Sequence, residues 1–204
     1  MSERTLGVVL FPGFELLDVF GPLEAFGNLP GTYRVTMVAE QAGPVASAQG
    51  PRVVADHGFA DCPRLDLMLV PGGIGTRDEA ENPRLLQWLA RRAADADIVT
   101  SVCTGTALLA RAGLLDGKRA TTNKAFFQWV ADQGPKVEWV KQARWVDAGK
   151  FVTSSGVSAG IDMALHVIAR LDGRDLAENL ARMMEYEWHT DADVDPFAKV
   201  WGLV

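Results

Sequence analysis

One cysteine stands where a predicted strand meets a predicted helix. Residues 98–102 are mostly β-branched, which is typical of a buried central strand. Cys103 follows, then three small residues, and a helical apolar run begins at 107–110. In open α/β sheets, the carboxyl end of a strand is where ligands bind. Cys103 is therefore the first candidate for nucleophilic chemistry.

The position of Cys103 predicts a reactive thiol. The unpaired N–H groups and the dipole of a helix N-terminus favour an anion, so we expect them to lower the pKa of this thiol. The arrangement is a cysteine version of the nucleophile elbow, although Ser101 stands where that pattern has its first glycine. Such an elbow holds its nucleophile in a sparsely allowed backbone conformation. The alternative is that Cys103 is a small buried hydrophobic residue, the commonest fate of a free cysteine.

A second candidate is Asp18, which lies among apolar residues in a predicted helix at 16–26. Aspartate has poor helix propensity, and burying it without a partner costs free energy. Near the thiol, Asp18 would be a carboxylic acid whose pKa is set by burial and which is suited to proton transfer. The alternative is a helix N-cap or a satisfied surface carboxylate.

A glycine turn follows the predicted strand at 67–70 and contains Gly72, Gly73 and Ile74. Glycine lets backbone N–H groups face a ligand without a side chain between them. We expect this turn to bind substrate and to stabilise a developing negative charge. The alternative is a plain tight turn. The Gly-x-Gly-x-x-Gly pattern is absent, so no dinucleotide site is predicted.

Strands and helices alternate along the chain, which predicts an α/β domain with a mostly parallel sheet and helices on both faces. A small hairpin is expected within residues 45–56, and the acidic tail at 190–196 is expected to be exposed. The other expected strands span residues 6–11, 33–39, 119–122, 137–140, 143–146 and 151–154, and the other helices span 83–94, 124–131, 161–171 and 175–188.

The composition narrows the class of protein. The 204 residues suit one domain over 1–204, and a net charge of −6 with scattered basic residues predicts no nucleic-acid surface. No apolar run reaches the length of a membrane span, and the start of the chain does not read as a signal peptide. Cys62 and Cys103 form no metal-ligand or disulfide pattern, so we expect a cytoplasmic protein with reduced thiols and no cofactor. His57, His166 and His189 are interpreted as ordinary side chains because none neighbours the elbow.

From about residue 6 to residue 171, the chain resembles the ThiJ/PfpI family of the class I glutamine amidotransferase-like superfamily. The resemblance implies a flavodoxin-like three-layer sandwich, usually a homodimer with its site near the subunit interface. It rests on six ordered segments, which lie at residues 11–22, 59–63, 70–73, 101–105, 113–122 and 155–162.

Within that family the chain is most similar to the isonitrile hydratases, which combine an L-x-D-x-x-G-P segment with a Cys-Thr-Gly elbow. The resemblance makes Cys103 the nucleophile, Asp18 the acid and base, and Thr104 the adjacent hydroxyl. It implies a lyase that hydrates an organic isocyanide to an N-substituted formamide through a cysteine thioimidate, without metal or organic cofactor.

One departure from the subgroup concerns the substrate. Asn123 and Lys124 stand where isonitrile hydratases carry His-Trp, and Asn123 joins Gly72, Gly73 and Ile74 as a predicted substrate-binding residue. In protease-like members a histidine follows the cysteine, whereas here Thr104 does. This difference disfavours peptide hydrolysis. The remaining alternatives are another cysteine hydrolase of the family, and a ligand or redox sensor related to the sensor domains of AraC-type regulators.

Overall fold

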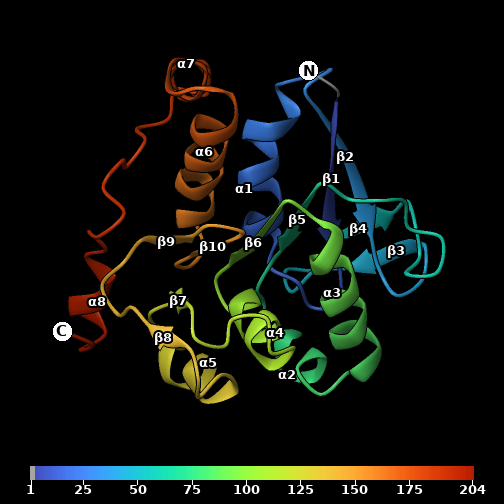
Figure 1. The fold of residues 1–204 in the computed structure, drawn as a ribbon, viewed down its shortest axis with the longest axis horizontal. Helices are drawn as coiled ribbons and strands as arrows, with labels where there is room; N and C mark the ends of the chain where they lie inside the picture. Colours follow the sequence, from blue (N-terminus) through green and yellow to red (C-terminus); the bar gives the residue numbers. More distant parts are fainter. Residues whose placement is uncertain (1–2) are drawn as a thin grey trace.

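The computed structural model describes residues 3–204 and is built around one six-stranded sheet (Figure 1). The strand order is β2-β1-β5-β6-β10-β9, and every neighbouring pair is parallel except β10 and β9. This confirms the mostly parallel sheet. The strands of the sheet are β1 (Arg4–Val9), β2 (Tyr33–Val38), β5 (Leu67–Val70), β6 (Ile98–Val102), β9 (Trp145–Ala148) and β10 (Phe151–Ser154).

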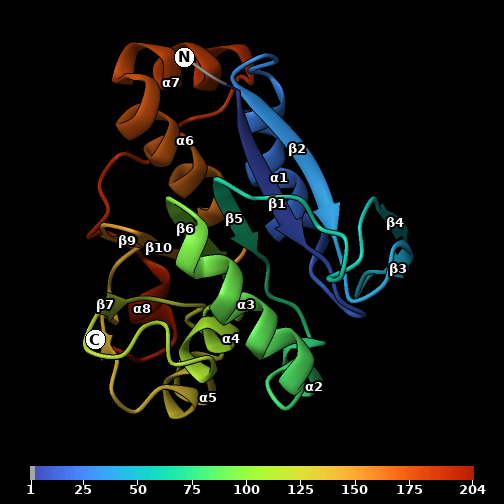
Figure 2. The same ribbon diagram turned by 45° about the vertical axis from the view of Figure 1, so that its right-hand side comes forward.

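Helices cover both faces of this sheet, as the turned view shows (Figure 2). The first and sixth helices pack together on one face, with the seventh beside the sixth, and the third and fourth lie on the other. The arrangement is the expected three-layer sandwich. The helices are α1 (Leu16–Gly27), α2 (Thr76–Glu79), α3 (Pro83–Asp95), α4 (Gly105–Arg111), α5 (Phe127–Gln133), α6 (Ala159–Asp172), α7 (Arg174–Met183) and α8 (Phe197–Val200).

Two smaller sheets flank the main one. The hairpin expected within residues 45–56 forms from β3 (Gly43–Ala46) and β4 (Arg52–Ala55). The segments expected as strands at 119–122 and 137–140 shorten to β7 (Arg119–Ala120) and β8 (Glu138–Trp139), which pair with each other rather than join the main sheet.

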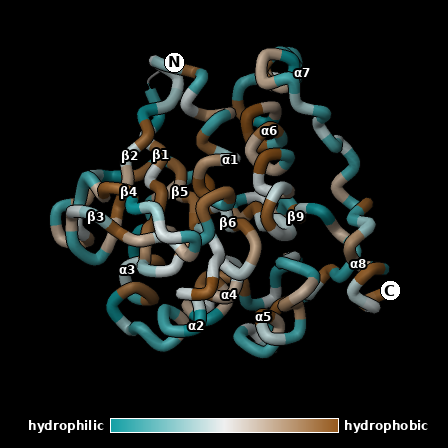
Figure 3. The backbone as a smooth tube through the Cα atoms, turned by 180° about the vertical axis from the view of Figure 1, so that it is seen from behind, coloured by the Kyte–Doolittle hydropathy of each residue, from teal (hydrophilic) through white to brown (hydrophobic). Residues whose placement is uncertain are grey.

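The central strands are buried along their whole length, which explains why they read as continuous apolar runs. Every residue of β5, β6 and β10 is buried. Figure 3 shows hydrophobic stretches along these strands and along the helices packed on them. Helix α1 continues through Pro22, so the proline does not end the helix. A Cβ at Gly21 would lie 2.9 Å from Cγ1 of Ile161, so this glycine lets α1 approach α6 closely.

The acidic tail at 190–196 is mostly exposed, as expected, but one of its aspartates is buried. Asp195 is buried, and its carboxylate lies 3.6 Å from Nζ of Lys124, which is buried as well. Lys124 also donates hydrogen bonds to Oγ1 of Thr121 (2.7 Å) and to the carbonyl of Ala143 (2.6 Å). A buried cation needs such partners, so the sequence after α7 returns and packs against the loop that follows β7.

This ion pair gives the first prediction. Asp195→Ala leaves the ammonium of Lys124 buried without its carboxylate, and breaking a buried pair from one side should lower the free energy of unfolding by about 3 kcal/mol. Urea unfolding followed by tryptophan fluorescence measures the change. Asp193→Ala is the matched control because Asp193 is exposed in the same segment. Equal stability of both variants would contradict an anchored tail.

Candidate active site

Cys103 occupies the predicted elbow between β6 and α4. Its φ is +56°, in the left-handed region that non-glycine residues rarely adopt, which confirms the strained conformation expected there. The neighbouring backbone fixes it: the Cys103 N–H donates to the carbonyls of Ser154 (3.3 Å) and Ser155 (3.2 Å), and its carbonyl accepts from Oγ1 of Thr122 (2.7 Å). The ends of β6 and β10 therefore hold the cysteine together.

Two glycines let the elbow lie directly against the end of β5. A Cβ at Gly105 would lie 2.4 Å from the carbonyl oxygen of Val70. A Cβ at Gly72 would lie 2.7 Å from Oγ1 of Thr104 and 2.9 Å from Oδ2 of Asp18. No side chain fits in either place, so glycine at these positions is what allows Thr104 and Asp18 to meet beside the cysteine.

Asp18 is fully buried on α1, within the helix rather than at its N-cap, which is Glu15. Its Oδ2 accepts a hydrogen bond from the N–H of Gly72 (2.8 Å), and its Oδ1 has no hydrogen-bond partner within residues 3–204. Burial raises the pKa of Asp18 to about 8, the Gly72 N–H opposes this, and the carboxylate of Glu15 adds to it. The N-cap and surface-carboxylate interpretations are both wrong: Asp18 is a buried acid.

The thiol does not have the lowered pKa that the sequence led us to expect. Burial raises the pKa of Cys103 above its ordinary value, and the charge of Asp18 raises it further. Hydrogen bonds from Thr104 and the Asn123 side chain act in the opposite direction. The cause is that Cys103 is only 6% exposed, so loss of hydration outweighs the N-terminus of α4, a helix of seven residues. The thiol and the carboxyl therefore bind and release protons as a pair.

A pocket of about 220 Å³ opens onto the cysteine. Cys103 and Thr104 line it together with three predicted substrate-binding residues, Gly73, Ile74 and Asn123. Asp18 and Gly72 lie behind this wall, where they contact the elbow. The structure thus brings every predicted site residue to one place.

The glycine turn contributes differently from what was expected. The N–H groups of its two glycines are already used: that of Gly72 donates to Asp18, and that of Gly73 donates to Oγ1 of Thr104 (3.1 Å). Oγ1 of Thr104 also accepts from the hydroxyl of Thr76 (3.1 Å). These N–H groups do not face the pocket as an anion cradle. They position the carboxyl and the hydroxyl beside the cysteine.

Sequence reasoning missed several residues of the pocket and gave too little weight to another. Arg77 and Phe126 both line it, although Arg77 lies in a short helix that no pattern predicted. Glu15, a weaker candidate in the sequence than Asp18, lies there too, and its carboxylate accepts a hydrogen bond from the amide of Gln49. Only the folding of α2 against α5 brings the arginine and its aromatic neighbours together, so the sequence carries no local signal for them.

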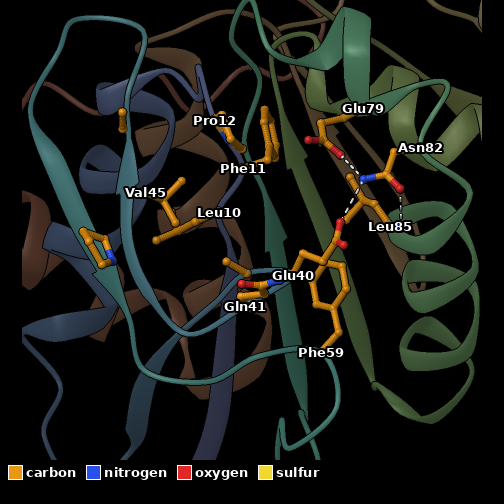
Figure 4. Close-up of a pocket in the computed structure, with 13 residues that line it drawn as sticks. Leu10, Phe11, Pro12, Glu40, Gln41, Val45, Phe59, Glu79, Asn82 and Leu85 are labelled. Atoms are coloured by element: carbon orange, nitrogen blue, oxygen red, sulfur yellow. Dashed lines mark hydrogen bonds between the residues drawn. The ribbon is translucent and has the colours of Figure 1, made fainter.

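A larger pocket of about 360 Å³ lies elsewhere, beyond the ends of β1 and β2 (Figure 4). The amide of Asn82 donates there to Glu79 (2.8 Å) and to Glu40 (3.3 Å), while its oxygen caps α3 through the N–H of Arg84 (3.0 Å). This pocket contains none of the predicted site residues. Its polar groups are satisfied by the helix cap that they form.

The described residues offer neither a metal-binding cluster nor a membrane-spanning helix. Within residues 3–204, no group of three or more histidine, cysteine, aspartate or glutamate side chains is arranged to hold a metal ion. In the same part of the chain, no helix is both long enough and apolar enough to cross a membrane.

The fold and the cysteine elbow define a known class of protein. A model of the DJ-1/PfpI family matches residues 4–170, and the chain belongs to this family. It is 39% identical over 181 residues to an isonitrile hydratase of Pseudomonas putida, covering 89% of this chain and 78% of that protein. A crystal structure of a ThiJ/PfpI family protein from Pseudomonas syringae is 34% identical with a TM-score of 0.85, covering 92% of this chain and 76% of the other.

Gene regulators are also among the relatives. The HTH-type transcriptional regulator GbdR of Pseudomonas aeruginosa is 30% identical over 191 residues. That match covers 91% of this chain but 52% of the regulator, so the chain spans about half of that relative. Likeness within the family therefore extends to proteins with different roles.

The buried carboxyl gives the second prediction. Because the folded state keeps Asp18 protonated up to about pH 8, whereas the ordinary pKa is 3.8, the unfolded chain releases this proton first and the free energy of unfolding falls as pH rises between these values. Asp18→Asn has no such proton, so the variant should exceed the wild type in free energy of unfolding by about 5 kcal/mol near pH 8.

Urea unfolding between pH 5 and pH 9, with steps of about one pH unit, measures this difference. It should shrink toward pH 5, where the wild type keeps its proton in the folded state. Asp97→Asn, at an exposed position, should show no such trend. A pH-independent difference between Asp18→Asn and wild type would contradict the raised pKa.

Proposed function

We propose that this chain is an isonitrile hydratase-like lyase that adds water to an organic isocyanide and releases an N-substituted formamide. The observation that carries the proposal is the buried carboxyl of Asp18, which stays protonated near neutral pH and contacts the thiol of Cys103. The similarity to the isonitrile hydratase of Pseudomonas putida supports it. An isocyanide carbon has a lone pair that accepts a proton and becomes electrophilic once protonated, so this pair suits it.

The first step forms a thioimidate. Asp18 donates its proton to the isocyanide carbon while the sulfur of Cys103 forms a bond to the same carbon. The thiol proton passes to the carboxylate that Asp18 has become. The pair thereby returns to a protonated acid, and no net charge develops in a pocket where charge is poorly hydrated.

The second step adds water and releases the enzyme. Asp18 gives its proton to the imidate nitrogen and takes one from the attacking water, whose oxygen bonds to the carbon. The tetrahedral adduct then breaks its carbon–sulfur bond. The hydroxyl proton leaves, the sulfur recovers a proton, and the formamide dissociates. Over both steps one water molecule is consumed and Cys103 returns to the thiol.

The other site residues position these groups. The hydroxyl of Thr104 is fixed by Gly73 and Thr76, and it holds the sulfur by a hydrogen bond. The amide of Asn123 also contacts the sulfur, in the place where isonitrile hydratases carry histidine. Ile74 adds an exposed apolar wall to the pocket. We assign Gly73, Ile74 and Asn123, which line the pocket, to substrate binding, and Gly72 to positioning Asp18.

We also propose a cytoplasmic homodimer that acts on a small molecule and binds neither nucleic acid nor membrane. Ile74 and Phe126 are exposed apolar side chains in the lining of the pocket, and Leu17 and Phe20 are exposed on α1, the helix that carries Asp18. Burying such side chains against a second copy would stabilise a pair of subunits and shield the site.

The similarity to GbdR favours a second candidate, a ligand or redox sensor without turnover. The thiol in its pocket would then bind a ligand or be oxidised, and it would not pass through a catalytic cycle. Another cysteine hydrolase of the family is a third. Turnover of isocyanides distinguishes the hydratase from both.

The third prediction follows. A panel of alkyl and aryl isocyanides, analysed by mass spectrometry, should yield the corresponding formamides, with incorporation of ¹⁸O from labelled water. Cys103→Ala should abolish turnover. Asp18→Asn keeps the shape but removes the transferable proton, so kcat should fall by about a thousandfold. Thr104→Val should cost less, about tenfold.

Matched controls distinguish loss of the catalytic groups from loss of folding. Cys62→Ala removes the other cysteine, which lies outside this pocket, and should retain normal turnover. Circular dichroism should show each variant folded. Absence of formamide across the panel, with folded wild-type protein, would move the assignment to the sensor, and normal turnover by Asp18→Asn would remove the acid role.

A further inference from the structure

Arg77 is a fixed cation in the wall of the cysteine pocket. The carbon of its guanidinium lies 4.1 Å from the ring centre of Trp129 and 4.7 Å from that of Phe126. Its Nη1 donates to Oγ1 of Thr76 (3.1 Å) and to the carbonyl of Gly73 (3.4 Å). Stacking and hydrogen bonds together fix the guanidinium beside the turn that holds the elbow.

No acidic side chain of residues 3–204 neutralises this arginine: none forms an ion pair with it within 4 Å. Arg111 and Arg170, which are partly exposed, each pair with a carboxylate. The hydrogen bonds of Arg77 within the described chain use Nη1, which leaves the edge formed by Nε and Nη2 without a protein partner. Two parallel N–H donors on one edge are the group that binds a carboxylate in bidentate fashion.

The pocket contains ionisable side chains of both signs, Glu15 and Arg77. The carboxylate of Glu15 accepts a hydrogen bond from Gln49, and the guanidinium of Arg77 lies against Phe126 and Trp129. Asp18 behind the cysteine keeps its proton near neutral pH and is uncharged. An anionic group entering the pocket is repelled by Glu15 and attracted to the guanidinium. A small anion would therefore be oriented with its opposite end toward the thiol and Asp18.

We propose that Arg77 binds a carboxylate of the substrate, so that the site takes small isocyanides that carry a carboxylate near the isocyano group. The isocyano part of this statement rests on the proposed function, whereas the anion subsite does not. Arg77 is then the residue that selects the substrate and sets the direction in which it enters. A pocket of about 220 Å³ restricts such a substrate to a small molecule.

The kinetic test compares isocyanoacetate with its methyl ester, a matched pair that differs in charge. Wild-type protein should favour the carboxylate in kcat/KM by about tenfold, and Arg77→Met should remove that preference by lowering kcat/KM for the carboxylate about tenfold more than for the ester. Arg77→Lys keeps the positive charge but lacks the two parallel N–H donors of the guanidinium, so it should retain part of the preference. Arg111→Met, at an exposed surface pair, should behave as wild type. An unchanged preference in folded Arg77→Met would overturn the subsite.

A second test needs no turnover. Iodoacetate and iodoacetamide are nearly isosteric, and each alkylates Cys103 when sulfur bonds to the methylene carbon, iodide leaves and the thiol proton passes to solvent. Relative to glutathione, wild-type Cys103 should favour iodoacetate by about tenfold, and this ratio should return to the glutathione value in Arg77→Met. Peptide mass spectrometry separates Cys103 from Cys62, and salt should weaken the preference.

The two tests fail separately. If no isocyanide is hydrated but the alkylation ratio depends on Arg77, the proposed function is wrong and the anion subsite stands. If isocyanides are hydrated and neither ratio depends on Arg77, the hydratase stands and the subsite is overturned. If circular dichroism shows that Arg77→Met is unfolded, Arg77→Lys provides the test. Bidentate binding is contradicted if the kcat/KM ratio of the two substrates and the alkylation ratio of the two reagents both equal the wild-type ratios in Arg77→Lys.

Discussion

The site depends on a carboxyl that is buried with too few hydrogen-bond donors to stay ionised. Asp18 receives one N–H, from Gly72, and leaves its second oxygen without a partner in the described part of the chain. A charged carboxylate there is poorly compensated, so the group keeps its proton to about pH 8. The same burial keeps Cys103 a thiol. This pair suits a reaction in which proton transfer and formation of the bond to sulfur occur in the same step. No free thiolate is then needed before the step begins.

The parallel sheet determines where that pair forms. The ends of β1, β5, β6 and β10 meet at one edge of the sheet, and the loops that follow them supply the acid, the glycine turn, the cysteine and its backbone acceptors. Gly72 and Gly105 are required because atoms of neighbouring loops occupy the space that a Cβ would need. The strained φ of Cys103 persists because these contacts determine its backbone.

Local sequence patterns predicted the elements and the elbow well, because buried strands and a small-residue turn leave clear signals. They predicted Cys103, Asp18 and Thr104 as site residues, which the structure brings together, and they predicted that burial sets the pKa of Asp18. They misjudged the pKa of the Cys103 thiol, since the extent of burial depends on the whole packing. The expected lowering of the thiol pKa and the free glycine N–H groups were both wrong for this reason. The buried Asp195 was missed because its partner Lys124 lies far away in sequence. Likewise, no local sequence pattern predicts that Arg77 lies against its aromatic neighbours.

The chain is similar both to an isonitrile hydratase and to a gene regulator, so the proposed chemistry rests on the protonation state of Asp18 rather than on the fold. Carbon-13 NMR of protein labelled at aspartate carboxyl carbons measures it directly, with Asp18→Asn assigning the resonance by its loss. We predict that this resonance titrates near pH 8, far above the ordinary aspartate value. A resonance that titrates near the ordinary pKa of about 4 would show an ionised Asp18 at neutral pH and would contradict the account.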